Sequence, residues 1–221
     1  MRARFALPLL AAAAAGWYLR SVYRFRDPVR LPPPDAGAVL SPADGVVCFV
    51  RRVEGGLVTG EAAVEAAALL GIAVGDGWLL GFFVGPLDVH YAYQPVTGQL
   101  LHASHTGARV NVPLLGLGEA LGLLTGRPAD LLARRGTLEN ERMTAVTRTA
   151  HGDVTLTLVA PGAGLHGTSF VRAGDEARAG HKAAFLAEGG LALLHLPAGY
   201  TPAVNVGDRV QGAQSVAARQ G

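Results

Sequence analysis

Five short segments contain the polar residues whose types and spacing could do chemistry. In chain order they are "YRFRDPVR" (23–30), "SPADGVV" (41–47), "GPLDVHYAYQPVTG" (85–98), "LENERM" (138–143) and a pair of Gly-Asp segments near the C-terminus. Each is a weak indicator when it is taken alone. "SPADG" by itself predicts a turn, because Pro42 fixes φ while Asp44 and Gly45 supply the bend.

Residues that commonly bind metals are few and scattered. Cys48 is the single cysteine, so the chain can form neither an intramolecular disulfide nor a thiolate zinc cluster. We interpret it as a small apolar residue of a strand. His102 and His105 flank a loop, and their spacing does not require a metal. We therefore predict no metal site.

Most of the chain after residue 37 predicts strands and turns. Runs rich in Val, Thr and aromatic residues, such as "GVVCFVRRV" and "GWLLGFFVG", are separated by Gly and Pro. Two segments predict short helices instead, residues 60–71, which end at glycine, and residues 117–136. Half of the residues are apolar and 16% are charged, which suits a chain with a sizeable core. The predicted fold class is β-dominated α+β.

A faint internal repeat lies near the C-terminus. "VRAGDEARAG" from Val171 and "VNVGDRVQGA" from Val204 are offset by 33 residues. Each has Gly-Asp after a short strand, which predicts a tight β-hairpin. Such paired units occur in barrel-sandwich modules like lipoyl domains. Lys182 lies between the units rather than at a hairpin tip, so a lipoyl-type carrier is only a minor alternative.

The first thirty residues are basic and partly apolar. They carry a charge of +5, whereas the remainder carries −3. The body therefore lacks the basic clustering of a nucleic-acid-binding protein, and the basic N-terminus suits anionic lipid headgroups. Residues 5–19 form an apolar run that would be about 22 Å long as a helix at ~1.5 Å per residue. This is shorter than the ~30 Å hydrocarbon core of a bilayer.

Three interpretations of this segment are open, namely a short membrane anchor, a cleaved signal peptide and a helix packed on the domain. Trp17, Tyr18 and Tyr23 beside arginines are typical of a membrane interface. We therefore favour a membrane-anchoring segment at residues 1–26. Residues 27–36 include four prolines and predict a stiff linker. Residues 37–221 are expected to form the domain.

Found together and in this order, the five segments resemble the phosphatidylserine decarboxylase family, especially its short bacterial and archaeal members. The resemblance extends from about Tyr23 to Ala217. It implies a phosphatidylserine decarboxylase-like fold with barrel-sandwich-type hairpins near the C-terminus. It also implies a proenzyme that cuts its own chain at a Gly-Ser bond. The serine then becomes an N-terminal pyruvoyl group, the electron sink for decarboxylation.

The resemblance assigns roles to two polar residues. Self-cleavage needs a base for the serine hydroxyl, and a carboxylate that orients an imidazole can supply one. The family's aspartate corresponds to Asp44 and its histidine to His90. Some members have a second histidine where this chain has Tyr93, so the identity of the base stays open. The structural alternatives are that Asp44 only forms a turn and that His90 is a half-buried strand residue.

Two arginines are candidates for lipid binding. The planar guanidinium groups of Arg109 and Arg142 could bind a lipid phosphate, although a solvated surface position is the simpler interpretation of each. Asp88 and Asn140 are expected to cap turns or to bond loop backbone.

The serine that the family converts to its cofactor has no counterpart at the expected place. It would lie between the two Gly-Asp segments, before a short apolar strand, where this chain has Gly189-Gly190. No serine lies between the segments, and no threonine or cysteine lies between Lys182 and Gly199. Ser169 is the best stand-in but precedes the first segment. Glycine at 190 cannot become a pyruvoyl group, because it has no β-oxygen.

Two hypotheses follow. In the first, the chain is a phosphatidylserine decarboxylase-related protein of membrane phospholipid (phosphatidylethanolamine) metabolism that cannot self-process because Gly190 replaces the serine, so the pyruvoyl group is absent. In the second, it is an active pyruvoyl-dependent phosphatidylserine decarboxylase with a displaced processing residue. We expect the cell membrane as its location, with peripheral or N-terminal attachment, and an aminophospholipid as its partner. A homo-oligomer or an assembly with an active paralogue is a further expectation.

Overall fold

The computed structural model describes residues 3–35, 37–60, 63–116, 118–119, 122 and 129–221. Strands predominate over helices in these ranges. In chain order the elements are α1 (Ala3–Ser21), η1 (Tyr23–Phe25), β1 (Ala38–Leu40), β2 (Gly45–Glu54), β3 (Leu57–Val58), β4 (Val64–Glu65), α2 (Ala66–Leu70), β5 (Gly77–Val84), β6 (Tyr91–Tyr93), β7 (Gly98–Thr106), α4 (Arg135–Glu139), β8 (Arg142–Thr149), β9 (Gly152–Val159), β10 (Thr168–Ser169), β11 (Glu176–Ala177), β12 (Lys182–Phe185), β13 (Gly190–Pro197), β14 (Tyr200–Pro202), β15 (Arg209–Val210) and β16 (Val216–Gln220).

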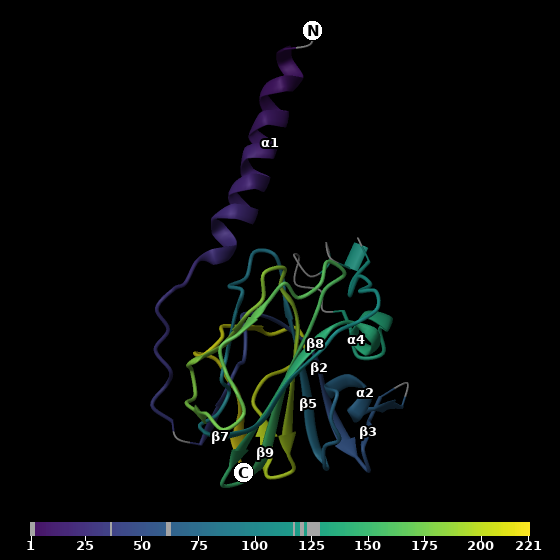
Figure 1. Ribbon diagram of the computed structural model, residues 1–221, viewed down its shortest axis with the longest axis vertical. Helices are drawn as coiled ribbons and strands as arrows, with labels where there is room; N and C mark the ends of the chain where they lie inside the picture. The colour runs from purple at the N-terminus through teal and green to yellow at the C-terminus, as the bar shows by residue number, and fades with distance from the viewer. Residues whose placement is uncertain (1–2, 36, 61–62, 117, 120–121, 123–128) are drawn as a thin grey trace.

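A large antiparallel sheet dominates the body (Figure 1). Within the described ranges it has ten strands, in the order β11-β7-β8-β9-β13-β5-β2-β3-β4, with β15 paired to β2. Strand β13 lies near its centre, where it pairs with β5 along its whole length and with β9 from Leu191 to His195. Two three-stranded sheets, β1-β16-β14 and β10-β12-β6, complete the body.

The core lies on both faces of the large sheet. The run "LALLHL" lacks the alternation of a half-exposed strand, and residues 190–196 are all buried. Leu194 and Phe82 belong to one hydrophobic cluster, whereas Leu193 and Phe49 belong to another. The start of β13 is therefore held between two cores.

The prediction of a β-dominated fold with few helices is confirmed. The helix predicted at residues 60–71 is only partly right, because Val64–Glu65 form a strand that pairs with β3. Residues 61–62 lie outside the described ranges. The short α2 ends as expected at Gly71, which adopts a left-handed φ of 73°.

Part of the second predicted helical segment, residues 117–136, cannot be compared with the structure. Residues 117, 120–121 and 123–128 lie outside the described ranges. Among its described residues, 118–119 and 122 are helical, 129–134 are not, and Arg135 begins α4.

The two Gly-Asp segments form matching turns. In each, the aspartate carboxylate accepts a hydrogen bond from the backbone N–H three residues before it, at 2.8 Å for Asp175 and 2.7 Å for Asp208. The strands that follow pair elsewhere, β11 with β7 and β15 with β2. The expectation of two tight hairpins is therefore wrong, because each short strand finds its partner in the large sheet.

The N-terminal helix α1 extends away from the body (Figure 1). Residues 8–21 are all exposed, so these residues of α1 are not buried against the body. Among the described residues, no helix combines the length and the apolar character needed to cross a bilayer. Residues 26–35 form no helix or strand.

Candidate functional site

The residues predicted to do chemistry gather at one end of the large sheet. Strand β13 begins beside the end of β5, because Gly190 pairs with Val84. Strand β2 pairs with the same end of β5 and begins there. Asp44 immediately precedes β2, and His90 lies in the loop after β5. The antiparallel register thus collects residues that are far apart in the chain.

Asp44 forms a largely buried ion pair with Arg30. The Nη2 of Arg30 donates to Oδ2 of Asp44 at 2.8 Å, and the two side chains are only 8% and 12% exposed. Oδ1 of Asp44 accepts the backbone N–H of Gly212, also at 2.8 Å. The carboxylate makes no hydrogen bond to His90. The expected Asp–His pair is therefore not formed, because an arginine from the linker occupies the carboxylate.

Tyr93 lies close to this carboxylate. Its ring lies against Gly212, whose N–H binds Asp44, and the charges of Arg30 and Asp44 both act on its hydroxyl. Burial is the largest influence and raises the pKa of Tyr93. The position of the second histidine in some family members is thus filled by a phenol that stays protonated at neutral pH.

His90 is buried, and neither of its ring nitrogens makes a hydrogen bond to the described residues. Its ring centroid lies 6.4 Å from that of Phe185. Burial lowers the pKa of His90 more strongly than the nearby backbone of Gly85 and Ala187 raises it. Ala187 belongs to the turn that leads into Gly189, so the predicted histidine does lie beside the predicted processing position.

Gly189 and Gly190 occupy places where a side chain does not fit. Their φ angles are 70° and 141°, which L-residues rarely adopt. A Cβ on Gly189 would lie 2.5 Å from the carbonyl oxygen of Val84. A Cβ on Gly190 would come within 3.0 Å of the carbonyl oxygen of Val159. Glycine in a strand often marks such a close backbone approach.

Arginines of the N-terminal segment hold the turn before β13. Arg20 and Arg24 both bind the carboxylate of Glu188, at 3.0 Å and 3.1 Å. Arg24 also donates to the carbonyl oxygen of Ala187 at 3.3 Å. The basic residues expected at lipid headgroups therefore contact the body as well.

Arg142 is not available to a lipid phosphate, and that expectation is wrong. Its side chain is buried, and burial lowers its pKa. The guanidinium instead ties α2 and α4 to β8 by donating to five backbone carbonyls, those of Ala68, Leu69, Thr137, Leu138 and Asn140. Arg109 is exposed, and its contact with a phosphate stays a prediction.

Two polar residues have the structural roles expected of them. Asp88 accepts a backbone N–H in its own loop at 2.8 Å. Asn140 bonds the backbone of Val112 and Ala160.

Burial raises the pKa of Cys48 to about 12, so it stays a thiol. Within the described ranges, no group of three or more His, Cys, Asp or Glu could hold a metal ion.

Sequence reasoning missed Arg30 and Glu188 as members of the site. Arg30 ends the segment "YRFRDPVR", whose arginines we interpreted as contacts of lipid headgroups. Glu188 precedes the glycine pair, but its partner Arg20 lies 168 residues earlier in the chain. One sequence feature could have predicted the pair of Arg30 with Asp44. The two residues belong to consecutive segments among the five, 23–30 and 41–47.

Replacing Arg30 tests the buried ion pair. In Arg30→Ala, Asp44 would stay buried with only one N–H partner, so we expect the free energy of unfolding in denaturant titrations to fall by about 3 kcal/mol. The control Arg135→Ala removes an exposed ion pair with Glu139 and should change the free energy of unfolding by about 0.3 kcal/mol. Equal effects of the two substitutions would contradict a buried, stabilising pair.

Burial of His90 makes stability depend on pH. Its pKa is lowered from 6.5, so below that value the unfolded chain binds more protons than the folded protein. Stability should therefore fall as the pH decreases through 6.5 toward the folded-state pKa. Burial also lowers the pKa of His195, so this residue likewise makes stability fall as the pH decreases. We expect His90→Gln to reduce the loss of unfolding free energy between about pH 7.5 and about pH 5.5. An unchanged loss would contradict a neutral buried imidazole.

Comparison with known proteins agrees with the ordered motifs. The family model described as phosphatidylserine decarboxylase matches residues 17–218. The phosphatidylserine decarboxylase proenzyme of Erythrobacter litoralis is 30% identical over 198 residues, covering 89% of this chain and 72% of that protein. The phosphatidylserine decarboxylase proenzyme of Mycobacterium marinum is 29% identical over 215 residues, covering 95% of this chain and 73% of that protein. The phosphatidylserine decarboxylase proenzyme of Nitrosomonas eutropha is 29% identical over 225 residues, covering 97% of this chain and 88% of that protein. Because the family model spans nearly the whole chain, the protein belongs to the phosphatidylserine decarboxylase family.

Proposed function

We propose that this protein acts in membrane phospholipid metabolism as an uncleaved member of its family, which binds an aminophospholipid at the membrane surface without decarboxylating it. The observation that carries the proposal is the glycine pair at the start of β13. This pair stands where the family resemblance leads us to expect a serine.

The residues at this position do not fit a pyruvoyl group. Gly190 has no hydroxyl that could attack the preceding carbonyl. A Cβ there would also come within 3.0 Å of the carbonyl oxygen of Val159, so a serine would require β9 or β13 to shift. Both features support a chain that stays whole.

The surroundings also lack a well-placed base for self-cleavage. Asp44 is occupied by Arg30, and the neighbouring Tyr93 carries a phenol whose pKa is raised by burial. His90 has a lowered pKa, but no carboxylate among the described residues bonds its ring to orient it. These features favour a binding role over self-processing.

The N-terminal segment supports attachment to a membrane surface. Helix α1 exposes Leu9, Leu10 and Trp17, and it is followed by arginines. An apolar helix flanked by aromatic and basic residues is typical of a segment at the interface of a bilayer that contains anionic lipids. We infer peripheral attachment through α1, with Arg109 as a candidate contact for a lipid phosphate.

Phosphatidylserine vesicles test this function. The full-length protein should sediment with them and produce no phosphatidylethanolamine on thin-layer chromatography. Leu10→Glu should weaken sedimentation by about tenfold, because it removes an apolar side chain from the bilayer. Leu57→Glu, at an exposed leucine of the body, is the control and should sediment normally. Formation of phosphatidylethanolamine by the full-length protein would instead establish the active-enzyme hypothesis.

Gly190→Ser supplies the missing hydroxyl. Because the position lacks room for a Cβ, we expect the variant to remain one chain on a denaturing gel. It should also lose on the order of 1–3 kcal/mol of unfolding free energy. Gly199→Ser is the control, since a Cβ at Gly199 meets nothing within 4 Å. Two fragments from Gly190→Ser, with a hydrazine-reactive carbonyl on the smaller one, would show that only the serine was missing.

A further inference from the structure

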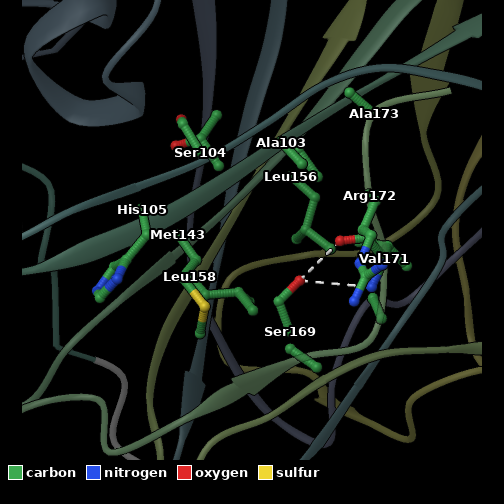
Figure 2. Close-up of a pocket in the computed structure, with 14 residues that line it drawn as sticks. Ala103, Ser104, His105, Met143, Leu156, Leu158, Ser169, Val171, Arg172 and Ala173 are labelled. Atoms are coloured by element: carbon green, nitrogen blue, oxygen red, sulfur yellow. Dashed lines mark hydrogen bonds between the residues drawn. The ribbon is translucent and has the colours of Figure 1, made fainter.

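An apolar cavity lies between the large sheet and the segment from Ser169 to Ala173 (Figure 2). Its volume is about 270 Å³. Strands β7, β8 and β9 supply one wall, and Ala183 and Ala184 of β12 supply another. The lining does not include Asp44, His90, Tyr93 or Gly190. The cavity is therefore distinct from the candidate site at the start of β13.

Small side chains create this cavity. Ala145 lies opposite Leu156 in the pairing of β8 with β9, and Ala183 and Ala184 face them from β12. Leu156, Ala183 and Ala184 are each less than 5% exposed, so this part of the floor is apolar and shielded from solvent. An apolar cavity of roughly 150 Å³ is already large enough to take up benzene and does not hold water well. A hydrocarbon chain suits the larger cavity here.

The charged groups lie at the rim, whereas the buried Thr144 also lines the cavity but donates its hydroxyl to the carbonyl oxygen of Leu70 at 2.7 Å. Arg172 is exposed, and its guanidinium makes no hydrogen bond or ion pair to the described part of the chain. The hydroxyl of Ser169 is already bonded to the backbone of Val171, at 3.1 Å to the carbonyl oxygen (Figure 2). His105 is bonded to Glu141 at 2.8 Å. Arg172 is thus a cationic side chain at the rim that has no ion-pair partner in the described part of the chain and can meet an anion.

We propose that this cavity binds a single-chain anionic amphiphile, namely a free fatty acid, with its chain on the alanine-rich floor and its carboxylate at Arg172. One chain is favoured over two because the volume falls below the roughly 300–1,000 Å³ of sites for larger ligands. An anionic head group is favoured because a guanidinium pairs well with a carboxylate. The inference does not depend on the proposed loss of self-processing, since it concerns a separate cavity.

Calorimetric titration of the full-length protein with dodecanoate, below its micelle concentration, tests the proposal. We expect saturable binding of one dodecanoate per chain. Ala145→Leu should weaken it by about tenfold, because the added methyl groups occupy space needed by the chain. Circular dichroism establishes that this variant is folded. Saturable binding that Ala145→Leu leaves unchanged would overturn the proposal, as would the absence of binding to the unaltered protein.

A second pair of variants tests the head group without altering the core. Arg172→Gln should weaken dodecanoate binding by about fivefold and leave dodecanol binding unchanged, since only the carboxylate carries charge. Arg178→Gln, at an exposed arginine that does not line the cavity, should leave the binding of dodecanoate and of dodecanol unchanged. Equal losses in the two variants would contradict a specific role of Arg172. Binding of a two-chain phospholipid that Ala145→Leu weakens, without any binding of dodecanoate, would overturn the single-chain assignment.

Discussion

Close backbone packing at the start of β13 constrains the rest of the candidate site. Gly190 lies between β5 and β9, and the carbonyl oxygen of Val159 leaves no room for a side chain there. Hydrophobic clusters on both faces of the sheet hold the strand in place. Because neither the neighbouring backbone nor the packed cores can move easily, a side chain at this position would distort the sheet.

The N-terminal segment is joined to the same end of the sheet by a row of arginines. Arg24 holds the turn before β13, Arg26 donates to a carbonyl of the loop that carries His90, and Arg30 pairs with Asp44. These contacts fix the path of the linker that follows α1. If α1 rests on a membrane, they keep the candidate site close to the lipid headgroups.

Local sequence patterns predicted much of the fold. The apolar run after the glycine pair was expected to form a strand and forms β13, and Gly71 ended its helix as expected. The Gly-Asp turns were right, but the strands that follow them pair with β7 and β2, which are distant in sequence. Such pairings depend on the whole sheet and not on the local segment.

The candidate site was harder to predict because its contacts are long-range. Asp44, His90 and the glycine pair were found through the ordered motifs, whereas the partner of Asp44 was not. Arg142 was misassigned because fully buried arginines are rare, and its partners are backbone carbonyls that no side-chain pattern marks.

The intact mass of the purified full-length protein tests the central claim most directly. If the glycine pair prevents self-processing, mass spectrometry should find one species of 22.8 kDa, and hydrazine treatment should not change its mass. Two chains, with a hydrazine-reactive carbonyl on the one that begins near residue 190, would contradict the account.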